Sequence, residues 1–72
     1  MFVIVRVNSI SGSVKYLTEN LRWSKFLQRA VLFSFSFEAD DFLSFAFRRS
    51  PPVPFYYEVW SVRPVSSVGG SL

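Results

Sequence analysis

The sequence predicts a small α+β domain in which a three- to four-stranded antiparallel sheet carries one long helix on one face, in a ββ-α-β-like order. Three observations predict it. Residues 2–8 and 13–18 are short segments rich in β-branched side chains and separated by turn residues. The segment from Ser34 to Arg49 combines apolar residues at helical spacing with acidic residues first and basic residues last. Residues 55–63, FYYEVWSVR, are again rich in aromatic residues and valine, which is typical of a strand.

The first two strands are expected to form a hairpin. Residues 2–8, FVIVRVN, are followed by a Ser-Ile-Ser-Gly turn in which Gly12 can adopt a positive φ. Residues 13–18, SVKYLT, follow closely enough to pair with the first strand in antiparallel orientation. The more uniformly apolar face of the first strand is expected to meet the core, and its residues are Met1, Val3, Val5 and Val7. The other face is then expected to point outward, and its residues are Phe2, Ile4, Arg6 and Asn8.

A loop over residues 19–22 leads to Trp23 and to a short helical segment, SKFLQRA, for which Ser24 is a suitable cap. Residues 31–33 could form a brief strand before the long helix. The long helix is expected to begin with Ser34 or Ser36 as its N-cap and to end before the Ser-Pro-Pro segment at residues 50–52.

The charges of this helix follow the order that a helix macrodipole favours. The acidic residues lie in its early turns and are Glu38, Asp40 and Asp41, and the basic residues that close it are Arg48 and Arg49. Its core stripe is predicted to consist of Phe35, Ala39, Phe42 and Ala46, flanked by Leu43 and Phe45. Phe37 lies on the far side and Phe47 at the flank.

Length and composition limit what the chain can be. With 72 residues it makes one domain, expected over residues 1–64, followed by a flexible tail over residues 65–72. It has no Cys and no His, which excludes disulfides, zinc fingers and nearly all metal sites, and no cofactor is expected. Nine residues are Phe, so stability must come from aromatic packing. The net charge of +3 excludes a strongly acidic mimic of the DNA backbone.

No segment is expected to enter a membrane. The apolar start, MFVIVRVNS, lacks the basic region and the small-residue cleavage site of a signal peptide. The longest apolar zone, residues 30–47, contains three carboxylates, each of which costs about 2.5–3.5 kcal/mol at a bilayer centre. We therefore expect a cytoplasmic protein.

One pattern spans about two-thirds of the chain, from Lys15 to Val62. It consists of Tyr16-Leu17-Thr18, Trp23, Leu27, Ala30, Phe33-Ser34, Glu38-Ala39 and Tyr57-Glu58-Val59. In this order of elements the chain resembles small uncharacterised proteins of bacteriophages and their hosts. The resemblance implies an α+β fold and a phage or mobile-element origin, with the host cell cytoplasm as the place of action. The helix of this chain is richer in Phe than the Glu/Lys-rich helix of that pattern, so it is more than a solvated cover.

Catalysis is not expected, because the usual general bases and thiol nucleophiles are missing. The three carboxylates of the helix could in principle bind a divalent metal, but their place in the early turns explains them without one. No catalytic and no metal-binding residue is therefore predicted. A glycine-rich phosphate loop is also missing, since Gly69-Gly70 precedes no helix.

Two kinds of partner remain. Protein binding is the leading hypothesis, because an apolar, aromatic sheet face edged by basic residues suits an interface. The predicted partner-binding residues are Phe2, Ile4, Arg6, Lys15, Phe37, Phe47, Tyr56 and Trp60. The expected function is that of a small phage-encoded protein that occludes a host or defence-system protein, for example an anti-CRISPR inhibitor, and a homodimer built on the Phe surplus is a further alternative. The competing hypothesis is a nucleic-acid-binding phage regulator, with stacking residues and cations at Tyr16, Tyr56, Tyr57, Trp60, Arg6, Lys15 and Arg63.

Overall fold

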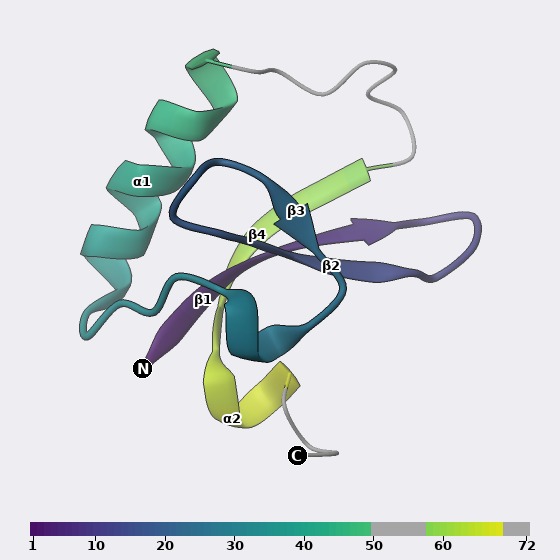
Figure 1. The fold of residues 1–72 in the computed structure, drawn as a ribbon, viewed down its shortest axis with the longest axis horizontal. Coiled ribbons are helices and arrows are strands. Elements are labelled where there is room, and N and C mark those ends of the chain that lie inside the picture. Colours follow the sequence, from purple (N-terminus) through teal and green to yellow (C-terminus); the bar gives the residue numbers. More distant parts are fainter. Residues whose placement is uncertain (50–57, 69–72) are drawn as a thin grey trace.

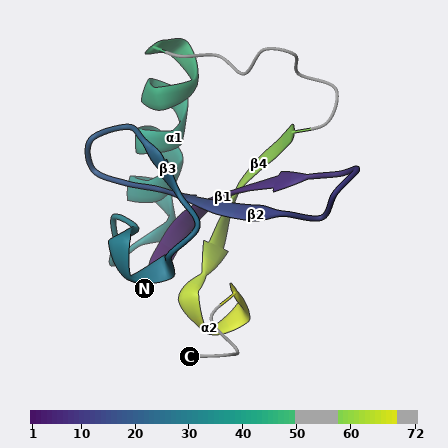
Figure 2. The same ribbon diagram turned by 45° about the vertical axis from the view of Figure 1, so that its right-hand side comes forward.

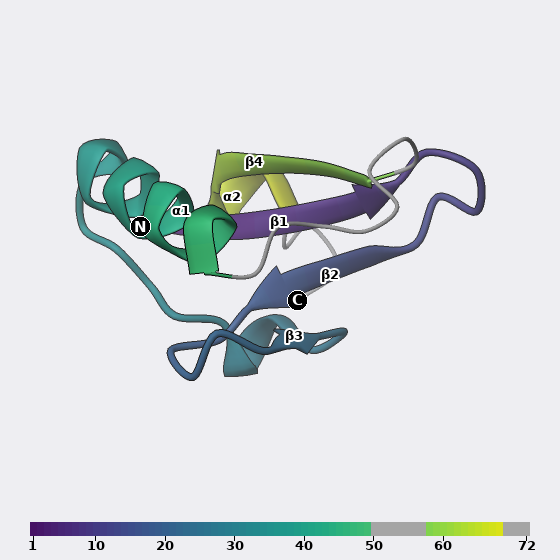
Figure 3. The ribbon, with the colours of Figure 1, turned by 90° about the horizontal axis from the view of Figure 1, so that it is seen from above.

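The computed structural model describes residues 1–49 and 58–68, which form a four-stranded antiparallel sheet with one long helix (Figure 1). The predicted α+β class is confirmed. The elements in chain order are β1 (Phe2–Asn8), β2 (Val14–Leu17), β3 (Trp23–Ser24), the 3₁₀ turn η1 (Leu27–Arg29), α1 (Ser36–Arg49), β4 (Glu58–Pro64) and α2 (Val65–Val68). Seen from above, the strands follow one another in the order β4, β1, β2, β3 (Figure 3).

The predicted hairpin joins β1 and β2. Its register places Val5 opposite Tyr16. The Asn8 side chain holds the turn, because its Oδ1 accepts hydrogen bonds from the backbone N–H groups of Ile10 and Ser11, both at 2.9 Å. Gly12 has a φ of 76°, the left-handed conformation that the sequence predicts for it.

The last strand pairs with β1 along its whole length, from Phe2 opposite Pro64 to Asn8 opposite Glu58. Strand β1 therefore has a hydrogen-bonded neighbour on each side. The predicted strand began at residue 55, but residues 55–57 lie outside the described residues. The predicted short strand at residues 31–33 is reduced to a single bridge, in which Phe33 exchanges two backbone hydrogen bonds with Phe2.

Helix α1 begins at Ser36, and the residue before it is Phe35 rather than a serine cap. The Phe35 carbonyl accepts the first helical hydrogen bond, from the N–H of Ala39 at 3.4 Å. The Glu38 carboxylate accepts a hydrogen bond from the Phe35 N–H at 3.2 Å, which is the acidic half of a capping box. The predicted serine caps are therefore wrong, whereas the predicted charge order is confirmed, with Glu38 in the first turn and Arg48 and Arg49 in the last.

The helix packs on the face of β1 that was expected to point outward, so the exposure predicted for that face is wrong. The burial predicted for Val3 and Val5 on the other face is confirmed. Ile4 is fully buried and packs in one cluster with Leu17 of β2 and with Ala39 and Ala46 of α1. Phe2, on the same face, is half-buried against this cluster. The prediction failed because it averaged hydrophobicity over the whole face of the strand. Arg6 and Asn8 lowered that average, although only the first half of the face, Phe2 and Ile4, enters this cluster.

The predicted helical stripe is confirmed in part. Ala39 and Ala46 are buried, and Phe42 and Leu43 pack against the same cluster. Phe35 and Phe45, however, are 57% and 48% exposed. Phe35 precedes the first helical residue, so the helical angle assigned to it does not apply. Phe45 lies about 100° from Ala46 around the helix axis, at the outer edge of the predicted stripe.

The other face of the sheet has its own core. Val3, Val5, Tyr16 and Leu27 form a second buried cluster, against which Ala30, Val65 and Val68 pack. In Figure 2, α1 and α2 lie on opposite sides of the strands. The tail that was expected to be flexible from Val65 onward thus starts with a helical turn, which is anchored by a hydrogen bond of 2.9 Å from the Val65 N–H to the Met1 carbonyl. Residues 69–72 lie outside the described residues.

The packing of α1 on the Ile4 face leads to a stability prediction. Ile4→Val removes one methylene from a fully buried site and should lower the free energy of unfolding by about 0.5–1.5 kcal/mol. Val59→Ala, at a strand position that is 56% exposed, should change it by less than about 0.5 kcal/mol. Urea unfolding followed by circular dichroism measures both. Equal effects of the two substitutions would contradict the burial of Ile4.

Candidate functional site

The residues predicted to bind a partner do not form one surface. Ile4 is fully buried and Phe2 is half-buried under α1, so the exposure predicted for these two residues is wrong. Lys15 is exposed, and Phe37 and Phe47 are 63% and 47% exposed. The remaining three are Arg6, whose side chain is 22% exposed, Trp60, which is half-buried, and Tyr56, which lies outside the described residues.

Three of the aromatic side chains that remain accessible are in contact with one another. The Phe47 and Trp60 rings meet edge to face, with centroids 5.3 Å apart and an interplanar angle of 76°. Trp60 meets Trp23 in the same way, at 4.9 Å and 62°. The guanidinium carbon of Arg6 lies 4.7 Å from the centre of the Trp23 ring. We call Phe47, Trp60, Trp23 and Arg6 the aromatic row.

Four elements supply one residue each to this row. Phe47 comes from the last turns of α1, Trp60 from β4, Trp23 from β3 and Arg6 from β1. The sheet register explains part of the arrangement, because Arg6 lies directly opposite Trp60 in the β1–β4 pair. Trp23 lies opposite Leu17, a residue of the cluster beneath α1, and so projects from the same face. The fold thus brings together side chains that are far apart in the sequence.

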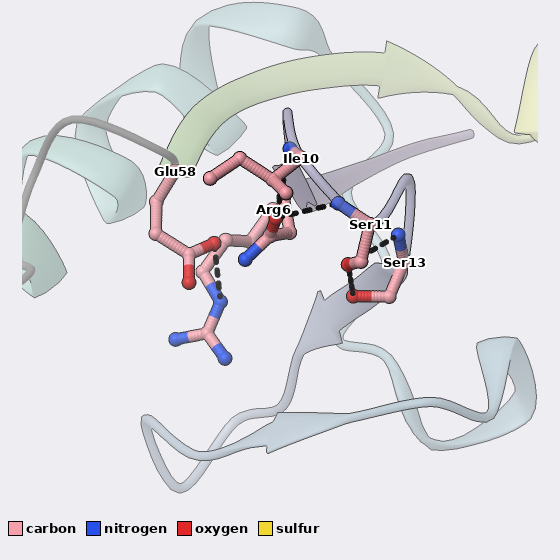
Figure 4. A network of polar contacts seen from close by, with 6 residues as sticks. Arg6, Ile10, Ser11, Ser13 and Glu58 are labelled. Atoms are coloured by element: carbon pink, nitrogen blue, oxygen red, sulfur yellow. Dashed lines mark hydrogen bonds and ion pairs between the residues drawn. The ribbon is translucent and has the colours of Figure 1, made fainter.

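An ion pair fixes the charged end of the row. The Nε atom of Arg6 lies 3.5 Å from Oε2 of Glu58, and the two side chains are 22% and 23% exposed. Figure 4 shows the Glu58 side chain reaching toward Arg6, beside the hairpin turn that contains Ser11 and Ser13. Because such partly exposed pairs contribute about 0–1 kcal/mol, the main effect is to hold the guanidinium against the Trp23 ring.

Trp60 carries an unusual polar group. Its indole Nε1 is buried and has no hydrogen-bond acceptor among the residues that the structure describes. An unpaired buried donor costs about 1–3 kcal/mol. Phenylalanine would supply a ring at this position without that cost, so burial of an aromatic ring alone does not explain the tryptophan.

A hollow of about 470 Å³ adjoins the row, and Trp23 is one of its lining residues. Trp23 and Phe26 supply its aromatic lining, Arg22 and Arg29 supply positive charge, and Glu19 supplies one negative charge. No local sequence pattern indicates this hollow, because its residues belong to a loop, to β3 and to η1. Trp23 was expected to follow a loop and belongs to the pattern shared with small phage proteins, but it was not predicted to bind a partner. It enters the row through its pairing with Leu17.

The residues predicted to bind nucleic acid lie on two different faces of the sheet. Tyr16 is only 9% exposed and belongs to the cluster around Val3. Arg63 lies opposite Val3 in the register and shares that face. Trp60, Arg6 and Lys15 lie on the other face, and Tyr56 and Tyr57 fall outside the described residues. The described members therefore make no single stacking platform.

Within residues 1–49 and 58–68, no group of three or more His, Cys, Asp or Glu side chains lies together as a metal site would require. The helices in those ranges are also too short or too polar to span a membrane.

The contact between the two tryptophans should be measurable. In a double-mutant cycle of Trp23→Leu and Trp60→Leu, we expect a coupling of about 0.5–1.5 kcal/mol in the free energy of unfolding, because edge-to-face pairs contribute this much beyond their buried area. A control cycle of Trp23→Leu with Val59→Ala, on the opposite face, should couple by less than about 0.5 kcal/mol. Similar coupling in both cycles would argue against the ring contact.

Comparison of the chain with protein-family models, with curated proteins and with solved structures gave no match in any of the three.

Proposed function

We propose that this chain is a non-enzymatic binding protein that docks on another protein through the aromatic row and occludes a site there. The observation that carries the proposal is the row itself, in which Phe47, Trp60 and Trp23 contact in sequence and Arg6 covers the last ring. Trp and Arg are among the residue types most enriched at the positions that dominate binding energy. In the row they are held by neighbours, so little side-chain entropy is lost on binding.

The half-exposed state of these rings also supports binding. Phe47 is 47% exposed, and both tryptophans are half-buried, so the row offers apolar area that a partner could remove from water. Lys15 lies opposite Arg6 in the register and supplies an exposed cation at the rim. An aromatic centre with a charged rim is the usual arrangement of a protein interface.

The resemblance to small phage proteins supports the class of partner that we propose. We propose a phage-encoded protein that acts in the host cytoplasm on a host factor or a defence system, such as a CRISPR effector. The absence of Cys and His from the sequence favours occlusion over catalysis as its mode of action.

Phe47→Ala tests the row, and the chain offers a matched control. Leu32 is 49% exposed, almost the same as Phe47, and belongs neither to the row nor to the lining of the hollow beside it. We expect Phe47→Ala to weaken the binding of a protein captured from host lysate by about tenfold or more, the effect of losing a residue at the centre of an interface. Leu32→Ala should weaken it less than about twofold. Calorimetry with the purified captured protein gives both values.

An inhibition assay on the captured protein tests occlusion separately from binding. The activity of the captured protein should fall in proportion to its occupancy by this chain, and Phe47→Ala should shift the inhibition curve by the same factor as the affinity. Full occupancy without any loss of activity would leave a binding protein but would refute occlusion.

A second candidate function rests on the hollow beside the row. Two arginines and two aromatic rings around a space of about 470 Å³ suit a single-stranded nucleic acid, whose bases stack and whose phosphates pair with guanidinium groups. If this is the function, affinity for single strands should fall steeply with salt and the salt slope should become shallower in Arg29→Gln, because one fewer counterion is released. Binding that does not respond to salt would exclude it.

A further inference from the structure

The outer face of α1 carries an ordered set of side chains that neither core cluster uses. Four exposed residues lie in one line at spacings of four, three and four, and they are Phe37, Asp41, Ser44 and Arg48. The buried side of the same helix carries Ala39 and Ala46. We call the four residues the outer stripe. It is distinct from the aromatic row, which α1 enters only through Phe47 at its flank.

The order along the stripe is an aromatic residue, an acid, a small residue and a base. Suppose that a helix packs against an antiparallel copy of itself across a two-fold axis. Each residue of the stripe then faces the residue of the second copy that lies equally far from the midpoint on the other side. The midpoint of this stripe falls between Phe42 and Leu43. Asp41 then meets Ser44 of the second copy, and Phe37 meets Arg48 of the second copy.

The observed position of the Arg48 side chain suits this arrangement. Its Nε donates a hydrogen bond to the Ser44 carbonyl at 3.4 Å, so the side chain is folded back along the helix toward Ser44. In the antiparallel pair, the residue that faces Ser44 is Asp41 of the second copy. Side chains on a helix lean toward its N-terminus, which brings that Asp41 toward the same guanidinium. The two-fold axis repeats the contact, giving two ion pairs.

The aromatic rings fit the same geometry. Phe37 is 63% exposed and stacks on Phe35, with centroids 5.5 Å apart and an interplanar angle of 19°. This pair of rings would cover the last turn of the second helix, where Arg48 lies. Phe45, with the Arg49 guanidinium carbon 5.7 Å from its ring centre, would border the contact on one side. Ser44 is small and allows the two helices to approach closely at the centre.

We propose that the outer stripe of α1 packs antiparallel against the outer stripe of a second copy of this chain, with Asp41 and Arg48 forming two symmetric ion pairs. Charge complementarity selects this occupant and this direction. Each stripe carries one acid and one base, which match in the antiparallel arrangement. A parallel arrangement would place Asp41 on Asp41 and Arg48 on Arg48.

The contact area makes this dimer a reversible one. Helix α1 has 14 residues, so it is about 21 Å long. Two such helices bury less than the roughly 800 Å² per partner of a standard interface, which places the dimer among weak, concentration-dependent associations. The dimer does not depend on the proposed function, and it would present two aromatic rows to a binding partner.

Charge reversal tests the pairing. Asp41→Arg leaves two bases on the stripe and Arg48→Asp leaves two acids, so each variant alone should dimerise about tenfold or more weaker than the natural chain. An equimolar mixture of the two variants should form a heterodimer of near-natural affinity, because the introduced arginine then meets the introduced aspartate. Sedimentation velocity from about 1 µM to about 1 mM measures these affinities. Arg29→Asp, which changes the net charge on η1 as Arg48→Asp does on α1, should dimerise like the natural chain.

Three results would refute the proposed dimer. A natural chain that stays monomeric across this range, or variants that dimerise as well as the natural chain, would refute it. So would a mixture that associates no better than its components. If charge reversal unfolds the domain, as seen by circular dichroism, Asp41→Asn and Arg48→Gln should each still weaken the dimer about threefold or more. Phe47→Ala should leave the dimer unchanged, which separates this test from that of the aromatic row.

Discussion

Burial of β1 on both faces is the constraint on which the rest of the structure depends. Val3, Ile4 and Val5 are three consecutive residues with 0%, 0% and 1% exposure. Because alternate side chains of a strand point to opposite faces, such a run requires cover on both sides of the sheet. Helix α1 supplies one cover, and η1 with α2 supplies the other. Pairing with β2 and β4 satisfies both edges of the strand.

The way in which α1 covers its face decides where the aromatic residues go. Its two fully buried residues, Ala39 and Ala46, are small, so the helix lies close to the strands. A close helix leaves room beneath it for few large side chains, and Phe42 and Leu43 occupy that room. The other rings of α1 and of Phe35 just before it must therefore point to the flanks or to the outside, where Phe35, Phe37, Phe45 and Phe47 are found.

The elements could be predicted from the sequence, but the face of β1 that α1 covers could not. Local patterns identified the hairpin, the long helix and the last strand, because β-branched runs, a turn glycine and the charge order of the helix are properties of neighbouring residues. The choice of face failed because both faces of β1 are apolar where it is buried. Averaging over the whole strand let Arg6 and Asn8 outweigh Ile4.

Of the candidate site, the sequence predicted some of the residues but not their arrangement. Arg6, Phe47 and Trp60 were identified as residues that could contact a partner, but their contact with one another depends on four elements meeting at one place. Trp23 was missed, since its role follows from the register of a two-residue strand, which no local pattern marks.

Exposed aromatic residues do not by themselves indicate function in a chain of this size. A domain this small buries only about 60–65% of the surface of its unfolded chain, so an aromatic content of 19% exceeds what its core can hold. What calls for another explanation is order among the exposed groups. In the aromatic row each ring meets the next edge to face, and an arginine held by Glu58 completes the series. On the outer stripe an acid and a base lie on opposite sides of one midpoint. Surplus rings left over from a small core would need neither arrangement, which is why binding is inferred from the geometry of these groups rather than from their number.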